Sequence, residues 1–448
     1  MQPAAKGRDG RLAQSKPMSA SGPVTEYCSR PRLLARRLVE VARRRQVRRA
    51  SLVACAALLG YALVRHLALH LDMVDMQVYR AEGQAVLDHR SLYAMRATRA
   101  NLAATYPPFA ALLFTPLAVL PVAVLRMLVT GANIGLLGVL GLLSCRFADW
   151  PGPAARPAVA VLAAGLGVWL EPMWTTLNYG QINLLLAVLV LWDLTLPDDR
   201  RHKGMAIGIA AGIKLTPALF IVYLLLSRRV RSAVVAGATA LGTAVVGAVL
   251  LPGNSVAFWT KDLFDTGRVG QVWIVDNQSL RGMLARLSHT PDPGPWAVLV
   301  VAAVGALGLA VAAASARAAG RTPRAEAWGG LCCAITALLV SPISWSHHWV
   351  WCLPVIVLLA AEASQHRRWR AAVAAAVVVF TCQCIWLVPH RGDRALHLPY
   401  WEMPFASAYP LAGLAFLGLA GLRLLDRPSE PVRAAADERA PDLVARAG

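Results

Sequence analysis

Long apolar runs alternate with short polar stretches along most of this chain, and the pattern predicts a helical membrane protein. The runs are rich in Ala, Leu and Val, and many approach the roughly 20 residues that a helix needs to cross ~30 Å of hydrocarbon. A transmembrane β-barrel would show short segments of alternating polarity instead. We therefore expect an all-α polytopic fold with about twelve spans, including broken or re-entrant helices. The expected crossings are 51–69, 122–145, 157–171, 184–197, 204–227, 231–252, 296–316, 328–343, 349–363, 371–388 and 404–425.

Two apolar segments do not fit a simple crossing. Residues 108–121 are short and contain two prolines, so we expect a re-entrant or interfacial segment. The run 204–227 is basic at both ends and carries Lys214 and Pro217 at its middle. If both ends are cytoplasmic, two half-helices of about 11 residues reach only ~17 Å each. This favours a broken helix pair whose irregular backbone lines a cavity, with one kinked span as the alternative.

The distribution of charge predicts the orientation in the membrane. Lys and Arg number 45 against 25 Asp and Glu, giving a net charge of +20, and the arginines cluster at the ends of apolar runs. No nucleic-acid partner is expected, because no binding motif accompanies the charge. The positive-inside rule gives a basic cytoplasmic N-terminal tail (1–50), a membrane catalytic domain (51–425) and a disordered cytoplasmic C-terminal tail (426–448). The expected outer segments of this plasma-membrane protein are 70–107, 253–295 and 344–348.

The first outer segment holds two carboxylates close to the membrane boundary. Asp72 and Asp75 are three residues apart, so they would share one face of a helix. One could act as a general base while the other orients it or stays exposed. The alternative is that both are solvated acids at a helix end, and the spacing alone does not decide between these interpretations.

Polar amides gather at a second outer segment. Asn178, Gln181 and Asn183 surround a glycine between two apolar runs. Neutral amides suit ligands rich in hydroxyl groups, because they donate and accept without a charge to desolvate. Turn formation is the alternative.

Three basic side chains are candidates for binding a phosphate. Lys214 interrupts an apolar run, where an ammonium costs ~2.5–3.5 kcal/mol unless it finds a partner. His347 and His348 can donate hydrogen bonds to phosphate oxygens. Snorkelling and an interfacial Trp-His belt are the respective alternatives. No metal-ligand spacing is evident, so neither metal nor cofactor is expected.

Six motifs occur in an order that resembles glycosyltransferase family 87, the polyprenol-phosphate-mannose-dependent mannosyltransferases of mycobacteria and their relatives. The resemblance covers roughly residues 50–425. The motifs are Val74-Asp75-Met76-Gln77-Val78-Tyr79, Tyr106-Pro107-Pro108, Asn178-Tyr179-Gly180-Gln181-Ile182-Asn183, Gly212-Ile213-Lys214-Leu215-Thr216-Pro217, Asn277-Gln278-Ser279 and Ser341-Pro342-Ile343-Ser344-Trp345-Ser346-His347-His348.

The resemblance implies a GT-C membrane fold and an inverting reaction on the outer face. The donor would be a polyprenyl-phosphate-mannose, and the acceptor a lipid-linked glycan of the lipoglycan or phosphoinositol mannoside type. The product would carry an α-linkage, with α-(1,2) expected. An arabinofuranosyltransferase that uses polyprenyl-phosphate arabinose is the alternative within the enzyme class. A transporter or flippase of a polyprenyl-linked sugar is the alternative from another class, although no internal repeat is visible.

The resemblance also implies that Asp75 is the catalytic base, with Asp276 and Glu171 next in line. Lys214, His347 and His348 are the candidates for the donor phosphate. The candidates for sugar or acceptor binding are Tyr79, Tyr106, Asn178, Gln181, Asn183, Asn277 and Ser279.

Overall fold

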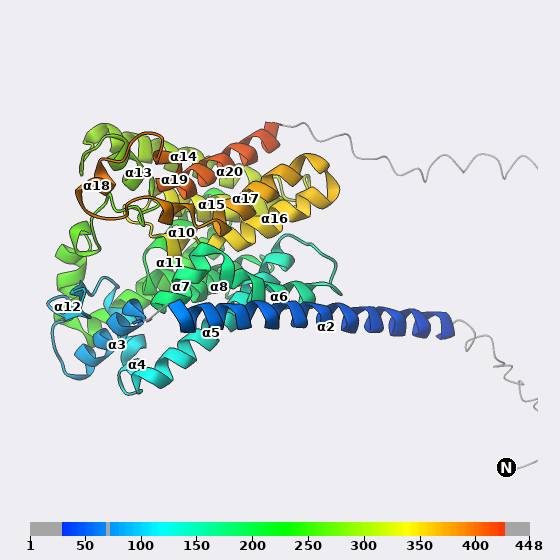
Figure 1. The fold of residues 1–448 in the computed structure, drawn as a ribbon, viewed down its shortest axis with the longest axis horizontal. Coiled ribbons are helices and arrows are strands. Elements are labelled where there is room, and N and C mark those ends of the chain that lie inside the picture. Colours follow the sequence, from blue (N-terminus) through cyan, green and yellow to red (C-terminus); the bar gives the residue numbers. More distant parts are fainter. Residues whose placement is uncertain (1–28, 69–71, 426–448) are drawn as a thin grey trace, which may run out of the picture. The chain divides into compact units, whose positions relative to one another are not determined.

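The computed structural model describes residues 29–68 and 72–425 and is almost entirely helical in these ranges (Figure 1). The exception there is an antiparallel hairpin of two short strands, β1 (Arg96–Ala97) and β2 (Leu102–Ala103). The expected all-α class is therefore confirmed. The expected C-terminal tail, 426–448, lies outside the described residues.

The chain divides into two units, Met1–Arg45 and Gln46–Gly448. The described part of the first unit is the beginning of helix α2 (Ser29–Ala68), so the basic segment that we expected as a tail is helical from Ser29 onward. Within α2, Glu40–Val64 is long and apolar enough to cross a membrane. All elements that follow belong to the second unit.

Six helices in the described ranges are long and apolar enough to cross a membrane, or up to seven with one bent pair, so the expected count of about twelve is not confirmed. Several carry apolar side chains that face outward, such as Val249 and Leu299, which are 72% and 70% exposed. A soluble protein would not leave so many large apolar side chains in water. Besides α2, the six are α5 (Val122–Phe147), α11 (Val230–Leu250), α14 (Pro295–Arg317), η5 (Ser346–Trp351) continued by α16 (Cys352–Gln365), and α20 (Ala408–Leu425).

Two of the expected crossings contain helices that are too short to span, and one of these helices, α8 (Asn183–Leu194), faces protein, whereas α17 (Arg370–Thr381) exposes most of its surface. The two helices have 12 residues each, about 18 Å at 1.5 Å per residue. The expected crossings 184–197 and 371–388 therefore do not span as single helices. In α8, most leucines are buried against neighbouring helices. Hydropathy does not distinguish a helix buried in protein from one buried in lipid.

The expected crossing 157–171 is bent. Helix α6 (Arg156–Leu166) continues through η1 (Gly167–Trp169), and the chain then turns by 78° into α7 (Glu171–Tyr179). Leu170 is extended at the turn, and the Glu-Pro pair that follows begins the new helix. The polar segment after residue 171 is thus mainly helical, not a loop.

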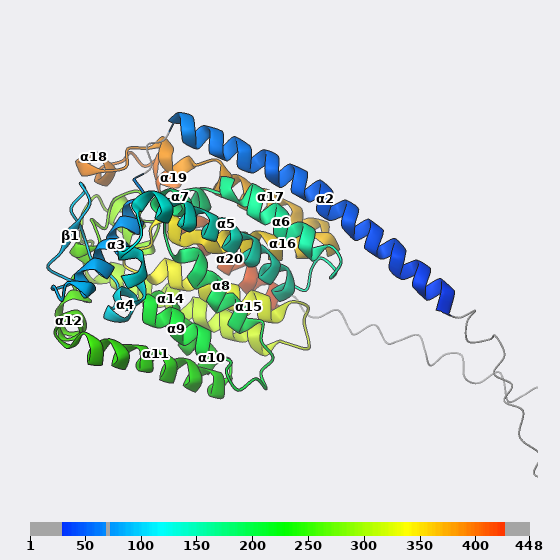
Figure 2. The same cartoon turned by 90° about the horizontal axis from the view of Figure 1, so that it is seen from below.

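The run 204–227 is a broken helix pair, as expected. Helix α9 (Met205–Ile213) ends before Lys214, whose backbone is extended, and η2 (Thr216–Ala218) leads into α10 (Leu219–Leu226). Figure 2 shows both helices beside α11.

Contacts with α11 establish that α9 and α10 form a hairpin. Three glycines spaced four residues apart lie against successive turns of α11, and a Cβ at any of them would collide with that helix. The pairs are Gly204 with Ser232, Gly208 with Ala236, and Gly212 with Thr243. Helix α9 therefore runs parallel to α11 from its beginning to its middle. Since α10 ends only a few residues before α11 begins, the pair enters and leaves at the same end of α11.

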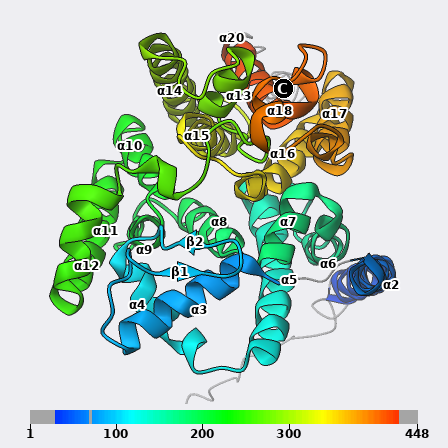
Figure 3. The same cartoon turned by 60° about the vertical axis from the view of Figure 1, so that its left-hand side comes forward.

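The remaining helices surround a core formed by α5, α8, α16 and α15 (Ala325–Val340), in which nearly every residue of α15 is buried. Figure 3 shows α3 (Val74–Leu87) and α4 (Pro108–Ala118) packed together beside the hairpin formed by α9 and α10. Helix α4 has 11 residues, in keeping with the short segment expected at 108–121. The segment expected as a long polar loop, 253–295, is largely helical. Its elements are α12 (Pro252–Ala257), η3 (Phe258–Asp262), η4 (Thr266–Arg268) and α13 (Leu280–Leu287). The last short elements are η6 (Arg367–Trp369), η7 (Cys384–Leu387), α18 (Gly392–Leu396) and α19 (Met403–Ala406).

Candidate functional site

Most of the residues singled out from the sequence meet in one hydrogen-bonded cluster, although they come from five separate parts of the chain. Most of them lie at or near a helix end. The members are Asp75 and Tyr79 on α3, Tyr106 before α4, Gln181 and Asn183 at the junction of α7 and α8, Lys214 after α9, and His348 in η5. We call this set the polar network.

One half of the polar network holds Asp75. The Gln181 Nε2 donates to Asp75 Oδ2 at 2.6 Å, while the Gln181 Oε1 accepts from the Tyr79 hydroxyl at 2.7 Å. The Tyr79 and Tyr106 hydroxyls lie 2.9 Å apart. Because the amide is bonded at both ends, Gln181 fixes the position of the carboxylate.

The other half is built around Lys214. Its Nζ lies 2.9 Å from His348 Nε2 and donates to Asn183 Oδ1 at 3.2 Å. Asn183 Nδ2 in turn donates to the backbone carbonyl of His347 at 3.0 Å. A weaker contact of 3.5 Å between Lys214 Nζ and the Tyr106 hydroxyl joins the two halves. An ammonium and an imidazole are thus concentrated at one end of the network and a carboxylate at the other.

The environment of Asp75 suits a general base. Burial raises the pKa of its carboxyl to about 6, although the hydrogen bond from Gln181 and the charge of Lys214 oppose the shift. A base whose pKa lies close to the working pH is both ionised and able to hold a proton. Asp72, the other candidate, is exposed at the start of this segment, and only its backbone carbonyl is bonded, to Gln77 and Arg126.

Local backbone geometry explains how the two halves come together. Gly180 ends α7 with φ +70°, a conformation that glycine adopts without strain. A Cβ at this position would lie 2.7 Å from the Cβ of Met76, so the absent side chain also lets the α7 end approach α3. Gln181 can therefore reach Asp75.

Asp193 connects α8 to the broken pair. Its carboxylate accepts hydrogen bonds from the backbone N–H groups of Gly204, Ala206 and Ile207 at 2.7, 2.9 and 3.2 Å. A carboxylate at a helix N-terminus satisfies donors that have no partner within the helix. This cap fixes α9 against α8, and so fixes Lys214 relative to Asn183.

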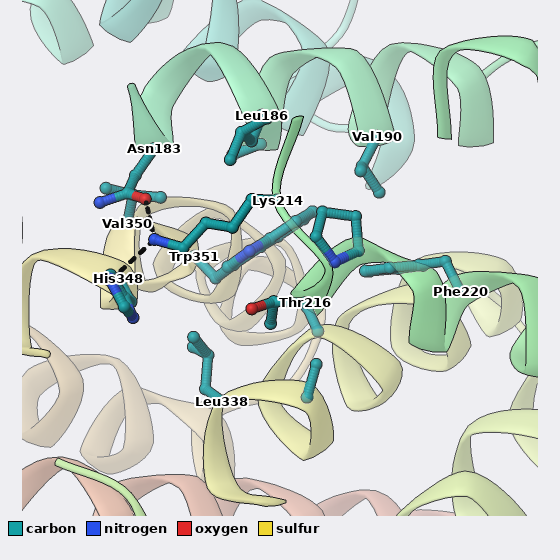
Figure 4. A pocket seen from close by; sticks show the side chains of 14 residues that line it. Asn183, Leu186, Val190, Lys214, Thr216, Phe220, Leu338, His348, Val350 and Trp351 are labelled. Atoms are coloured by element: carbon teal, nitrogen blue, oxygen red, sulfur yellow. Dashed lines mark hydrogen bonds between the residues drawn. The ribbon is translucent and has the colours of Figure 1, made fainter. Parts of the chain in front are cut away.

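A small cavity of about 50 Å³ opens beside Lys214 (Figure 4). Its polar end is formed by Lys214, Asn183 and His348, and Figure 4 shows the Lys214 amine directed toward the other two. Its remaining walls are almost entirely apolar and come from α8, α10, α15 and η5. They include Leu186, Val190, Phe220, Leu338, Val350 and Trp351. The cavity thus places an ammonium at one end of an otherwise apolar lining.

Four candidate residues lie outside the polar network. The His347 side chain is buried with its ring edge-on to those of Tyr179 and His348, and its Nε2 has no hydrogen-bond partner among the described residues. Asn178 accepts a 3.4 Å hydrogen bond from the Tyr61 hydroxyl. Asn277 bonds the backbone of Val272, Pro342 and Ser344, and Ser279 caps α13 by accepting from Gly282 N at 3.0 Å. Both of the latter are fully buried. Their polar groups hold the backbone, so we do not include them in the proposed sugar site.

The structure assigns Glu171 a role in joining segments of the fold, whereas the sequence had suggested it as an alternative catalytic base. Its carboxylate is fully buried and accepts from Thr175, Ser346, Trp386 and Tyr409 at 2.6 to 3.0 Å. These partners come from α7, η5, η7 and α20, so Glu171 joins four segments. Thr176 contributes as well, because its hydroxyl donates to the His347 carbonyl at 3.2 Å. The sequence pattern did not indicate either role.

Comparison with known proteins identifies the family. A related polyprenol-phosphate-mannose-dependent alpha-(1-2)-phosphatidylinositol mannoside mannosyltransferase from Mycolicibacterium smegmatis is 34% identical over 370 residues, covering 78% of this chain and 83% of that protein. A polyprenol-phosphate-mannose-dependent alpha-(1-2)-phosphatidylinositol pentamannoside mannosyltransferase from Mycobacterium tuberculosis is 32% identical, covering 78% and 80%.

A solved structure, that of ArnT from Cupriavidus metallidurans bound to undecaprenyl phosphate, is 17% identical, covering 84% of this chain and 77% of that one. Its TM-score of 0.38 supports no inference about this chain. Residues 104–342 match glycosyltransferase family 87, more than half of the chain. With these relatives, the match shows that the chain belongs to glycosyltransferase family 87.

Proposed function

We propose that this chain transfers mannose from a polyprenyl-phosphate-mannose donor to a lipid-linked acceptor of the phosphatidylinositol mannoside type, forming an α-(1,2) linkage with inversion. The observation that carries the proposal is the polar network, which joins a carboxylate at one end to an ammonium and an imidazole at the other. The names of the relatives favour mannose over arabinose, and a transferase over a transporter.

Asp75 is the proposed base. An acceptor hydroxyl attacks the anomeric carbon of the donor while Asp75 takes its proton, and the bond from that carbon to the phosphate oxygen breaks with its electron pair leaving on the phosphate. A single displacement of this kind needs one base and inverts the anomeric configuration. The hydrogen bond from Gln181 orients the carboxylate toward the acceptor.

Lys214 and His348 are proposed to hold the leaving phosphate, with His347 nearby. A phosphate monoester leaves as an anion, and a preorganised ammonium with a polar imidazole beside it stabilises the charge that develops on it. The apolar walls beside Lys214 would receive the first part of the polyprenyl chain. Tyr79, Tyr106, Gln181 and Asn183 are proposed to bond the sugar hydroxyls from the network side.

The proposed location is the plasma membrane, with the site on the outer face and a GT-C membrane domain around it. The distribution of arginines supports this orientation, because the loops flanking 204–227 are strongly basic. The polar network lies at the turn between α9 and α10, which is the end of the hairpin away from these basic loops.

The test is a transfer assay with the purified protein in lipid nanodiscs. Radiolabelled polyprenyl-phosphate mannose should label a phosphatidylinositol mannoside acceptor, and polyprenyl-phosphate arabinose should not. Digestion of the product with a linkage-specific α-mannosidase then reports the anomeric configuration. Transfer from the arabinose donor alone, or movement of the donor across the membrane without product, would overturn the proposal.

A further inference from the structure

A second group of polar side chains lies next to the polar network and takes no part in it. Asp276 and His390 are partly buried neighbours from segments far apart in the sequence, and exposed Arg391 follows His390. The charges of Arg391 and Arg286 both act on the Asp276 carboxylate. This group has no assigned role in the mechanism proposed above.

Backbone pairing positions Asp276 beside the histidines of the site. The Asp276 carbonyl accepts from the backbone N–H of Ser346 at 2.8 Å, and Asn277 forms an antiparallel bridge with Trp345. His347 is the next residue after Ser346. Asp276 is therefore paired with the backbone of the segment that carries His347 and His348.

The Asp276 and His390 side chains face one another across a gap. Asp276 Oδ1 and His390 Nε2 are 3.7 Å apart, too far for a hydrogen bond. Both atoms are buried, and neither has a hydrogen-bond partner among the described residues. A buried polar atom without a partner costs free energy unless a ligand or water satisfies it. A hydroxyl group that approaches the pair from the side can donate to the Asp276 carboxylate and accept from the His390 Nε2–H at ordinary hydrogen-bond distances.

Two aromatic rings lie close to this pair of side chains or to the neighbouring histidine of the site. The Trp386 ring stacks on the His390 ring at 4.3 Å with an interplanar angle of 20°, and its indole N–H donates to Glu171 at 3.0 Å. The Tyr179 ring lies edge-on to His347, with the ring centroids 5.4 Å apart. Tyr179 is also two residues before Gln181, which holds the proposed base.

We propose that Asp276 and His390, with Tyr179 and Trp386 beside them, form the subsite that binds the terminal sugar of the acceptor glycan. This inference rests on the proposed function. A carboxylate and an imidazole that share one hydroxyl, next to aromatic faces, match the alternation of hydroxyls and C–H faces on a hexose. Tyr179 is two residues before Gln181, which bonds Asp75, so the proposed subsite adjoins the base along the chain.

The test measures acceptor binding without any donor, so that it stands apart from turnover. Binding of octyl α-mannoside, below its critical micelle concentration, is measured by titration calorimetry with the protein in nanodiscs. Asp276→Asn and His390→Asn should each raise the Kd about 10-fold, as expected for losing a hydrogen bond to a charged or buried partner. The double variant should lose less than the product of the two, since both groups bind one hydroxyl.

Asp393→Asn is the matched control. Asp393 lies three residues after His390, but its side chain is 90% exposed, so its variant should bind the mannoside as wild type does. Binding of a short-chain polyprenyl phosphate, titrated in the same preparations, should stay within two-fold in all variants. An unchanged mannoside Kd in both single variants, or an equal loss of polyprenyl phosphate binding, overturns the assignment. If wild type transfers no mannose yet binds octyl α-mannoside through these residues, the proposed function fails and the subsite stands.

Discussion

Replacing Asp75 by Asn tests the proposed mechanism most directly. Asn keeps the size of the side chain, and its carbonyl oxygen can still accept the hydrogen bond from Gln181 Nε2. The network with Tyr79 is therefore preserved, while the proton acceptor is lost. General-base catalysis typically contributes ~10²–10⁴-fold, and we expect kcat for mannose transfer to fall by about that factor.

The raised pKa of Asp75 adds a prediction about pH. Only the ionised carboxylate can take the acceptor proton. With a pKa of about 6, roughly one-tenth of the enzyme is ionised at pH 5, whereas an ordinary aspartate would be more than nine-tenths ionised there. The rate of wild type should therefore rise about 10-fold from pH 5 to pH 7 and then level off. The residual rate of Asp75→Asn should lack this rise.

The assay uses purified protein, saturating donor and initial rates of label transfer from pH 5 to pH 8. Loss of stability is not expected to explain a slow Asp75→Asn variant. Because the folded-state pKa of Asp75 is raised, the stabilisation due to its neutral form is present at low pH and lost as pH rises through about 6. An uncharged Asn should thus be at least as stable at pH 7.5. Asp72→Asn is the matched control and should keep its rate within two-fold. A fast Asp75→Asn variant, or a wild-type profile flat down to pH 5, would refute the reasoning.

Three further variants test the parts that position the base and the phosphate. Lys214→Met should lower kcat/KM for the donor by about 10²–10³, measured by label transfer, and Lys214→Arg should recover part of this loss. Normal activity of Lys214→Met would indicate that the Lys214 side chain only extends toward the membrane surface. Gln181→Glu places a second carboxylate against Asp75, which should raise the pKa of Asp75 and move the acid limb of the rate profile to higher pH. Asp193→Ala removes three bonds to the α9 backbone and should cost about 1–2 kcal/mol, seen as a lower Tm; an unchanged Tm would show that the cap is dispensable.

The helical class and most members of the site could be predicted from the sequence. Lys214 stood out because it interrupts an apolar run, and Asp75, Tyr106 and Gln181 lie in motifs that resemble the family. All four belong to the polar network. The number of spans could not be predicted in the same way, because several apolar runs are buried in protein. Nor could the sequence show that the Asn277 side chain bonds the backbone of Val272 and Pro342, because those contacts depend on the tertiary fold.

The subsite around Asp276 and the hydrogen bonds that Glu171 makes to four segments both depend on contacts that residue spacing in the sequence does not reveal. Glu171 and Trp386 are 215 residues apart, and Asp276 and His390 are 114 apart, so no local pattern links them. Only the tertiary fold determines that one acid is paired with four donors while another faces an unpartnered imidazole. From the sequence alone, Asp276 and Glu171 were equal candidates for an alternative base, whereas the structure gives the two carboxylates different surroundings.

The polar network has a structural cause that the positions of its members reveal. Asn183 begins α8, Lys214 directly follows α9, and Gln181 follows the glycine that ends α7. A helix interior satisfies its own backbone, but the groups at its ends need outside partners, and in an apolar surrounding they and nearby polar side chains gather together. Breaking apolar helices within the protein thus creates a polar site at the depth of the break. For this chain the breaks in the apolar runs, more than the runs themselves, indicate where the chemistry lies.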